Sequence, residues 1–292
     1  MTIAWGLQPL LDRMGEVRPS LDELAAAWSS DRSRLLLVDE RGGVALSDGS
    51  VLGVPTGGDF DEGRDVLLGE SGGLTWFGRR GAVDGGVTLR DHEFAPAERE
   101  LVTAATAVLA WHDGAGFCER CGQPSVVVSG GFQRRCTGCG REIFPRTDPA
   151  MIVAVLDTDD RLLLAHQASW PEGRVSVLAG FLEAGESAEH AVVREVHEES
   201  GLHVVDAKFI ASQPWPYPRS LMLGFMARAT GEIAVDEQEI AWARWYTPED
   251  LTAAEAEGLT LPGKGSIAGR MIDAWRNGEL DSSPLAPAKP HA

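Results

Sequence analysis

Residues 180–202 read GFLEAGESAEHAVVREVHEESGL, and this stretch decides the fold. It fits the pattern G-x5-E-x7-R-E-U-x-E-E-x-G-U, in which U is aliphatic, at every fixed position. Glu195, Glu198 and Glu199 stand at i, i+3 and i+4, so a helix places them on one face. Three carboxylates there repel one another unless a cation neutralises them, and such hard oxygen ligands suit Mg²⁺ or Mn²⁺. The pattern therefore predicts a divalent metal site, with Glu186 as a fourth ligand.

The remaining positions of this stretch predict how the helix is held. An apolar face made by Ala188, Ala191, Val192 and Val196 can pack on a sheet and leave the glutamates at the rim. Gly201 is a suitable helix terminator, and Arg194 can pair with Glu198 one turn later. The alternative is a solvated acidic helix that binds no metal, and the simultaneous match at all fixed positions argues against it.

The four cysteines of the chain form a second motif upstream. They are spaced C-x2-C-x14-C-x2-C at Cys118, Cys121, Cys136 and Cys139. Two such pairs supply four thiolates for a tetrahedral Zn²⁺ with no open coordination position, which is typical of a structural site. Two disulfides or four unrelated thiols are the alternatives. The absence of a secretory signal argues against disulfides, because the chain is then expected in a reducing compartment.

A proline-rich segment follows downstream, where residues 212–220 read SQPWPYPRS. Three alternating prolines make the segment stiff and exclude an ordinary central strand. Trp215 and Tyr217 offer flat faces for stacking, and Gln213, Arg219 and Ser220 offer hydrogen bonds to a polar ligand. Such a turn is more often structural than ligand-binding when it occurs alone. Beside the glutamate pattern, it predicts one side of a binding site.

Together, the three motifs resemble the NAD(H) pyrophosphatase family, the NudC-like Nudix hydrolases, over about residues 90–268. Tyr217 stands where the family more usually has Phe. The resemblance implies an α+β protein, with a Nudix α/β/α sandwich preceded by a small four-cysteine zinc ribbon and a β-rich amino-terminal domain. It also implies metal-dependent hydrolysis of NADH or NAD⁺ to AMP and nicotinamide mononucleotide, and it allows removal of NAD caps from RNA.

The resemblance also assigns roles to individual residues. The magnesium or manganese ligands fall on Glu195 and Glu199, with Glu198 beside them and Glu239 outside the motif. The candidates for the general base are Glu198 and Glu239, and Arg194 completes the catalytic set. Phe144 keeps a stacking face, although relatives often have Tyr there. The expected substrate contacts are Arg90, Phe144, Ala179, Phe181, Gln213, Pro214, Trp215, Pro216, Tyr217, Pro218, Arg219, Ser220 and Ala268.

Two other functions stay open at this level. One is a Nudix hydrolase of ADP-ribose or another nucleoside diphosphate derivative, against which the 213–220 segment argues. The other belongs to a different class: a zinc-ribbon binding protein whose Nudix domain only senses a ligand. The complete set of glutamates argues against a mere sensor, and failure to hydrolyse any diphosphate with Mg²⁺ or Mn²⁺ would favour it.

Charge and hydropathy restrict the partners. The net charge of -18 argues against broad attraction to nucleic acid or anionic lipid, but bound divalent ions still permit a dinucleotide. Arg134, Arg135, Arg141 and Arg146 form either a basic patch on the ribbon or, as we prefer, solvated scatter. The sequence contains neither a secretory segment nor an apolar run of membrane-spanning length, which predicts a cytoplasmic protein. The resemblance implies a homodimer in which Phe144 and Phe181 meet across the interface.

The pattern of apolar runs and breakers predicts the domain organisation. We expect a β-rich domain at 1–95, a linking helix and zinc ribbon at 96–144, a Nudix domain at 145–280 and a disordered tail at 281–292. Within the first domain, 35–38 and 43–46 are expected to form a hairpin. Helices are expected at 96–111 and 265–275, and strands at 151–156, 161–166, 203–211, 221–229 and 242–246.

Overall fold

The structure is a computed structural model that describes residues 8–235 and 239–280. The described chain forms two compact units. The amino-terminal unit contains residues 8–147 together with 214–220, and the carboxy-terminal unit contains 148–213 and 221–280. The predicted tail at 281–292 lies outside the described residues, and the finer domain boundaries stay a prediction.

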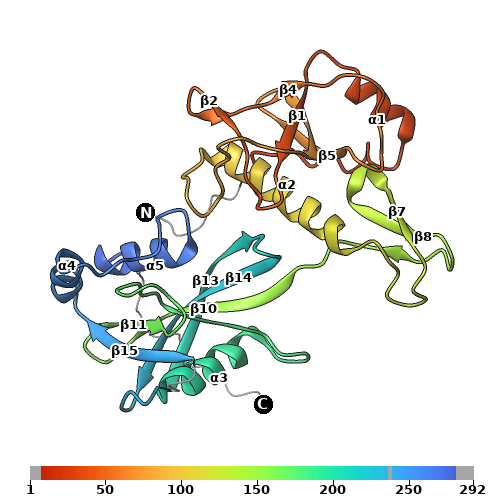
Figure 1. The fold of residues 1–292 in the computed structure, drawn as a ribbon. Helices are drawn as coiled ribbons and strands as arrows, with labels where there is room; N and C mark the ends of the chain where they lie inside the picture. The colour runs from red at the N-terminus through yellow and green to blue at the C-terminus, as the bar shows by residue number, and fades with distance from the viewer. Residues whose placement is uncertain (1–7, 236–238, 281–292) are drawn as a thin grey trace. The chain divides into compact units, whose positions relative to one another are not determined.

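The amino-terminal unit is built on a four-stranded sheet of order β4-β1-β6-β5, in which β1 and β6 run parallel (Figure 1). One face of β1 packs Leu36 and Val38 against helix α2, and the other packs Leu35 against Trp28 of α1. This alternation follows from the period of two in a strand. The elements are α1 (Leu21–Trp28), β1 (Ser33–Val38), β2 (Leu46–Ser47), β3 (Ser50–Val51), β4 (Val54–Pro55), β5 (Val66–Ser71), β6 (Leu74–Arg80) and α2 (Pro96–Gly114).

The predicted hairpin between 35–38 and 43–46 is wrong. The turn forms, because the Gly42 amide donates to the Asp39 carbonyl, but the chain after it does not pair with β1. Val44 instead bridges to Val87, while β1 pairs with β4 and β6. The partners of β1 are remote in sequence, and short-range turn chemistry does not reveal them.

Helix α2 leads into a three-stranded ribbon of order β7-β8-β9. The expected helix is confirmed, with its first turn opened by Pro96. The ribbon comprises β7 (Ser125–Val128), a 3-10 turn η1 (Ser129–Gly131), β8 (Gln133–Cys136) and β9 (Glu142–Ile143).

The carboxy-terminal unit contains a six-stranded sheet of order β13-β14-β10-β11-β15, with β12 paired to β10. Its strands are β10 (Asp148–Leu156), β11 (Leu162–Gln167), β12 (Leu178–Phe181), β13 (His203–Trp215), β14 (Ser220–Thr230) and β15 (Ile240–Tyr246). Its helices are α3 (Ala188–Ser200), α4 (Pro248–Ala256) and α5 (Ile267–Arg276). Each strand and helix predicted for this region from the sequence is present.

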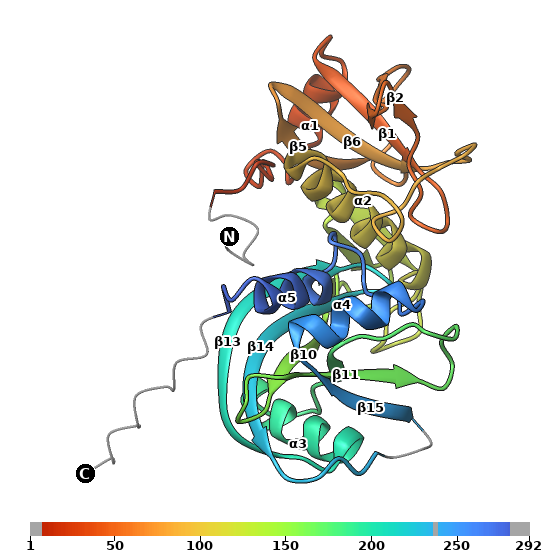
Figure 2. The same ribbon diagram turned by 90° about the vertical axis from the view of Figure 1, so that its left-hand side faces the viewer.

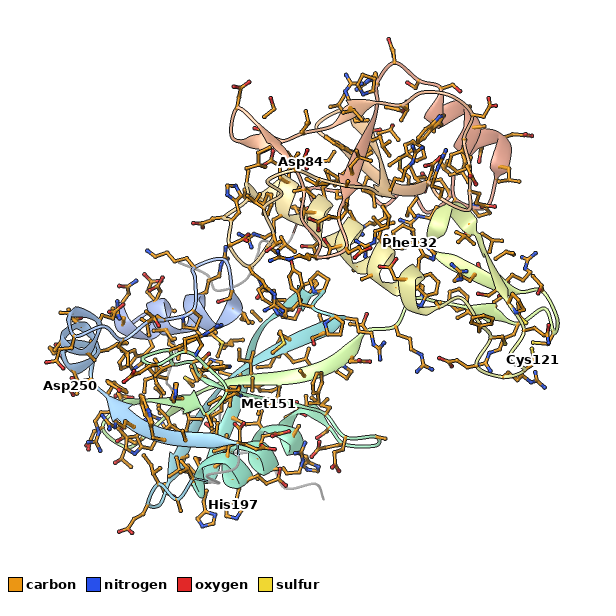
Figure 3. The ribbon with its side chains drawn as sticks, in the orientation of Figure 1. Asp84, Cys121, Phe132, Met151, His197 and Asp250 are labelled. Atoms are coloured by element: carbon orange, nitrogen blue, oxygen red, sulfur yellow. The ribbon has the colours of Figure 1, made fainter. Side chains whose placement is uncertain are left out.

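Helices cover both faces of this sheet, as Figure 2 shows for α3 on one side and α4 and α5 on the other. Alternate residues of β10 point to opposite cores, so Met151 and Val153 pack toward α3, and Ile152 and Ala154 pack toward α5. Met151 is labelled on this central strand in Figure 3. The arrangement is the predicted α/β/α sandwich. In the part of the chain that the structure describes, no helix combines the length and apolarity needed to cross a bilayer.

Candidate active site

Helix α3 is fixed at both ends, which sets the direction of its glutamates. Ser187 caps the start by accepting a hydrogen bond from the His190 amide at 3.2 Å. Gly201 closes the helix in the left-handed conformation, with φ at 71°. The apolar face of Ala191, Val192 and Val196 is buried in the core, as predicted. The acidic face is therefore held at one edge of the sandwich.

The structure places four of the five predicted metal-binding glutamates around one cavity. Glu195, Glu198 and Glu199 of α3 line one cavity with Glu239, which directly precedes β15. The cavity has a volume of about 830 Å³. Its other lining residues come from the end of β11, from the β11–β12 loop, from β12 and from α3: Gln167, Ala168, Ser169, Ala179, Gly180, Phe181 and Arg194.

Glu199 is the unusual member of this cluster, because its side chain is buried. The residue is 4% exposed, and its Oε2 has no hydrogen-bond partner among the described residues. Burial, and after it the charges of Glu195, Glu239 and Glu198, raise the pKa of Glu199 to about 8. A buried carboxylate with an unpaired oxygen beside other carboxylates is costly unless a cation joins it. The donor set, all carboxylate oxygens, fits Mg²⁺ or Mn²⁺.

Gly180 on β12 leaves the space that Glu195 occupies. A Cβ added at Gly180 would lie 2.0 Å from the carboxylate carbon of Glu195. The backbone conformation of Gly180 is not the reason for glycine, since its φ is not positive. Glycine is needed at this position because the Glu195 carboxylate lies close to the backbone of β12. The position of β12 therefore affects the position of this glutamate.

Arg194 contacts two glutamates of the cavity and holds their carboxylates in place. Its guanidinium donates to Glu198 Oε2 at 3.0 Å and lies 2.9 Å from Glu195 Oε1. It also donates to the carbonyl of Phe181 at 2.9 Å, which fixes the end of β12 to α3. The predicted pairing of Arg194 with Glu198 is confirmed. Because it holds other groups, Arg194 is a positioning residue in this geometry.

The same guanidinium binds both oxygens of Glu186, at 2.8 and 2.9 Å. The Glu183 amide adds a hydrogen bond to Glu186 Oε2 at 3.0 Å. These contacts, with Arg194 as the largest cause, lower the pKa of Glu186 to about 2. Glu186 does not line the cavity formed by the other four glutamates. Its predicted role as a metal ligand stays a prediction, and its observed contacts orient Arg194.

Three further predicted substrate residues lie in the carboxy-terminal unit. Phe181 ends β12 with 58% of its surface exposed, so its ring is available for stacking. Gln213 is buried, and its side-chain amide accepts from the Ile267 amide at 2.7 Å and donates to the Gly265 carbonyl at 2.9 Å. Gln213 therefore secures the start of α5, next to the buried Ala268. A direct contact of the Gln213 side chain with substrate stays a prediction.

The other predicted substrate residues lie in the amino-terminal unit, where the structure brings three of them together. The guanidinium carbon of Arg90 lies 4.4 Å from the ring centroid of Tyr217 and 5.6 Å from that of Trp215. The Tyr217 hydroxyl accepts from the Leu89 amide at 3.1 Å. Phe144 is 58% exposed and, with Pro218 and Arg219, lines a separate cavity of about 150 Å³.

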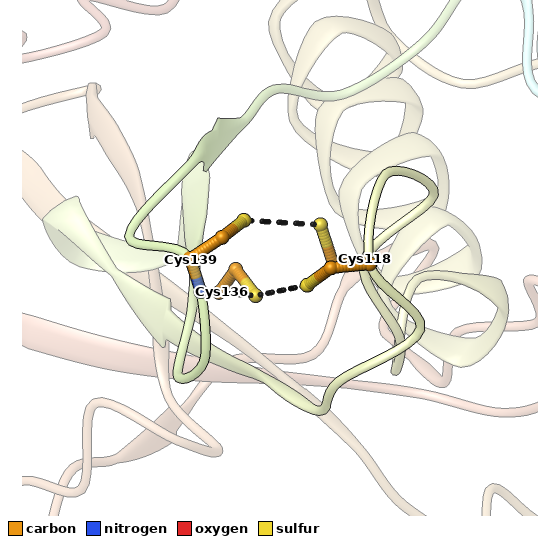
Figure 4. Close-up of side chains that lie close together, drawn as sticks. Cys118, Cys136 and Cys139 are labelled. Carbon is orange, nitrogen blue, oxygen red and sulfur yellow. Dashed lines mark hydrogen bonds between the residues drawn. The ribbon is translucent and has the colours of Figure 1, made fainter.

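The four cysteines converge in the ribbon (Figure 4). The sulfur atoms of Cys118 and Cys139 are 3.8 Å apart, those of Cys121 and Cys136 are 3.4 Å apart, and all four lie within 4.8 Å of one another. None forms a disulfide. The backbone amides of Cys139 and Gly138 donate to the Cys136 sulfur, and the Cys139 amide is the largest cause that lowers the pKa of Cys136 to about 6. This clustering of polarised thiols fits a tetrahedral Zn²⁺.

The chain matches known proteins in the regions that carry these sites. Residues 146–262 match the NUDIX domain, and residues 115–144 match the NADH pyrophosphatase zinc ribbon domain. The NAD-capped RNA hydrolase NudC of Mycobacterium bovis is 39% identical over 301 residues, covering 91% of this chain and 94% of that protein. The NAD-capped RNA hydrolase NUDT12 of Homo sapiens is 40% identical over 192 residues, covering 61% of this chain and 42% of that protein.

The chain belongs to the NudC-like NAD(H) pyrophosphatase family of Nudix hydrolases. The family, the fold and the enzyme class expected from the sequence are confirmed. The Nudix motif is the stretch 180–202, and the zinc ribbon is the module of the four cysteines.

One residue of helix α2 that supports the zinc ribbon carries no sequence signal of this role. His112, near the end of α2, places Nε2 2.8 Å from the Gly131 carbonyl and Nδ1 3.0 Å from a nitrogen of Arg134. Arg134 also donates to the hydroxyl and the carbonyl of Ser125 at 2.8 Å. Arg134 thus connects helix α2 to strand β7 and does not belong to a surface patch. Arg135 and Arg141 are exposed. No sequence signal pairs His112 with Arg134, because the contact arises from folding the ribbon onto α2.

The His112 contacts predict a pH dependence of stability. Burial, followed by the charge of Arg134, lowers the pKa of His112 from 6.5 to about 4. The unfolded state therefore binds more protons between those values, so the amino-terminal unit should lose stability as the pH falls from 6.5 to 4. Thermal unfolding of the wild type and of His112→Gln, measured across this range, tests the expectation. An equally steep loss in both proteins would contradict it.

Removal of zinc should unfold the ribbon and leave the Nudix sandwich intact. The ribbon strands are only two to four residues long, and a ribbon of this size depends on its metal for folding energy. Hydrogen exchange before and after chelation should show lost protection at 118–143 and unchanged protection at 151–156. Retained protection in the ribbon of the metal-depleted protein would refute a structural role for zinc.

Proposed function

We propose that this protein hydrolyses the diphosphate of NADH or NAD⁺ to AMP and nicotinamide mononucleotide, and that it also removes NAD caps from RNA. The observation that carries the proposal is the buried, unpaired carboxylate oxygen of Glu199 beside Glu195, Glu198 and Glu239 in one cavity. The printed names of the relatives, which are NAD-capped RNA hydrolases, support the choice of substrate.

The metal ligands in this proposal are Glu195, Glu199 and Glu239, with Glu198 beside them. A Mg²⁺ or Mn²⁺ ion held there supplies charge neutralisation of the diphosphate and activation of the attacking water. Glu198 or Glu239 accepts the proton of that water. Arg194 donates a hydrogen bond to Glu198 Oε2 at 3.0 Å, so one oxygen of this carboxylate already has a partner.

The proposed substrate contacts follow from position and chemistry. Phe181 offers an exposed ring at the rim of the glutamate cavity, and Ala179 lies on the same strand. Ala268 contributes backbone contacts at the start of α5. In the amino-terminal unit, the contacts are those of Arg90, Phe144 and the segment 214–220.

We also propose that the protein is cytoplasmic and works as a homodimer in which Phe144 and Phe181 contribute to one site across the interface. The exposure of both rings, 58% each, supports this arrangement. If it holds, specific activity should fall on dilution in parallel with the dimer fraction measured by sedimentation. Unchanged specific activity of the monomer would contradict the shared site.

Product analysis tests the proposed reaction. The protein is incubated with NADH, NAD⁺, ADP-ribose or NAD-capped RNA, in the presence of each divalent metal in turn. We expect AMP and nicotinamide mononucleotide from the dinucleotides, and RNA with a 5′-monophosphate from the capped RNA. Hydrolysis of ADP-ribose but of none of the other three substrates would contradict the proposal and indicate an ADP-ribose hydrolase.

A further inference from the structure

A pocket in the amino-terminal unit gathers positive charge on an otherwise acidic protein. It has a volume of about 150 Å³, and its lining includes three arginines and two aromatic rings: Arg13, Arg146, Arg219, Phe132 and Trp215. The net charge of the chain is -18, so a random surface would present mainly acidic groups. We call this site the arginine pocket.

The depth of the arginine pocket comes from helix α2. Thr103, Ala104 and Ala107 line it with short side chains, which leave room between the helix and the segment 214–220. Phe132, labelled in Figure 3, joins from the turn before β8. The guanidinium carbon of Arg18 lies 3.6 Å from the Phe132 ring centroid. This side of the pocket therefore carries additional positive charge.

The positive charge around the pocket is incompletely neutralised. In residues 8–235 and 239–280, Arg13 makes no hydrogen bond or ion pair, and Nε and Nη2 of Arg18 are buried without a partner. The charge of Glu100 acts on Arg13 without a hydrogen bond between them, and its carboxylate accepts the amides of Leu10 and Leu11. Arg146 pairs with Glu119 at 3.1 Å, but both side chains are about 60% exposed, so an incoming anion can compete for this contact.

These groups match the chemistry of a nucleotide phosphate. Arginine forks bind phosphate oxygens in pairs, and an indole ring can stack on a base. The diphosphate of a dinucleotide would find its counter-charge in a divalent cation held by the glutamates, whereas an RNA chain brings further phosphodiesters. A chain of net charge -18 repels RNA unless local cations attract it. The arginine pocket supplies such cations.

We propose that the arginine pocket binds a phosphodiester of the RNA that follows an NAD cap. The proposal rests on the proposed function, since it extends the same substrate beyond the dinucleotide. Arg13 and Arg146 contact the phosphate oxygens. Trp215, which belongs to the segment proposed above to contact the dinucleotide, stacks on the base that adjoins this phosphate. The bound group is a nucleotide phosphate, and free phosphate is the competing source of that chemistry.

The test compares two substrates in one variant. The double substitution Arg13→Gln with Arg146→Gln should lower kcat/KM on NAD-capped RNA by at least about tenfold while changing kcat/KM on NADH less than about twofold. The slope of log kcat/KM against log salt for the capped RNA should become less negative by about 0.7 for each lost phosphate contact. Arg141→Gln, at an exposed ribbon arginine outside the pocket, is the charge-matched control and should leave both values unchanged.

Other outcomes overturn the proposal. Equal losses on NADH and on capped RNA would show that the pocket serves the dinucleotide, and no loss on either would show that it is not a substrate site. If inorganic phosphate alters NADH turnover in the wild type but not in the double variant, and the two substrates are not discriminated, free phosphate is the ligand.

A binding measurement separates this proposal from the proposed function. Anisotropy of a fluorescent, uncapped single-stranded RNA should report weaker binding to the double variant than to the wild type or Arg141→Gln. This result does not depend on turnover. If the double variant and the wild type bind this RNA equally while NADH is hydrolysed, the pocket proposal is wrong and the proposed reaction stands. If the variant binds RNA more weakly but neither protein hydrolyses NADH, the proposed reaction is wrong and the pocket proposal stands.

Discussion

Glu199→Gln should lower kcat for NADH hydrolysis by at least about a hundredfold, on the scale expected when a group central to acid-base and metal chemistry is lost. The substitution keeps the size of the side chain but removes the charge that a divalent cation requires. The buried position of Glu199 and its unpaired Oε2 make this the most sensitive of the four glutamates. Steady-state kinetics with saturating Mg²⁺ or Mn²⁺ measure the effect.

The stability of Glu199→Gln provides the control. The pKa of Glu199 is raised to about 8 in the folded protein, so between pH 4.5 and 8 the folded state holds a proton that the unfolded state releases. Without added divalent metal, wild-type stability should therefore fall as the pH rises through this range. The variant lacks this loss and should melt no earlier than the wild type at pH 8. Near-normal turnover in a well-folded variant would contradict the role of Glu199.

Gly180→Ala should reduce activity by a comparable factor without unfolding the sandwich. The added methyl group would lie 2.0 Å from the carboxylate carbon of Glu195, and that carboxylate is the end of a flexible side chain that can move away. The cost therefore appears in the position of a metal ligand, where a displacement of about 1 Å can reduce the rate by about a hundredfold. Kinetics and thermal unfolding of the same preparation separate the two effects.

Gly263→Ala is the matched control for Gly180→Ala. It lies in the same unit, and a Cβ added there meets nothing within 4 Å. It should retain wild-type turnover. If Gly180→Ala also retains it, the close approach of Glu195 to β12 has no part in catalysis.

The parts of the protein that were predictable are those specified by local spacing. The i, i+3, i+4 glutamates fix one helical face, and the cysteine spacing brings four sulfurs together, so the zinc site and the helical part of the glutamate site follow from short stretches of chain. Glu239 reaches the same cavity from a remote part of the chain. Long apolar strands and the α2 helix were likewise readable from their periodicity. Helix α1 was missed, although Ser20 caps it and Asp22 and Glu23 lie in its first turn. The helix has only eight residues, so its apolar residues do not repeat often enough to indicate a helix within a β-rich region.

The parts that were not predictable depend on contacts between distant residues. The parallel pairing of β1 with β6 joins Leu35 to Phe77, and no local pattern reports it. The engagement of Gln213 with Gly265 and Ile267 is equally remote in sequence. Glu199 becomes buried only when α3 packs on the sheet. The sequence therefore does not distinguish it from its exposed neighbour Glu198.

Titration of the zinc-loaded protein with Mn²⁺ in two buffers of different ionisation enthalpy, at pH 7, tests the central claim most directly. Metal ligands must be deprotonated, and Glu199, with a pKa of about 8, is mainly protonated at this pH. We predict that Mn²⁺ binding releases close to one proton and that Glu199→Gln abolishes this release and weakens binding. Binding of equal strength and equal proton release in both proteins, or no binding to either, would contradict the assignment of the glutamate cluster as the catalytic metal site.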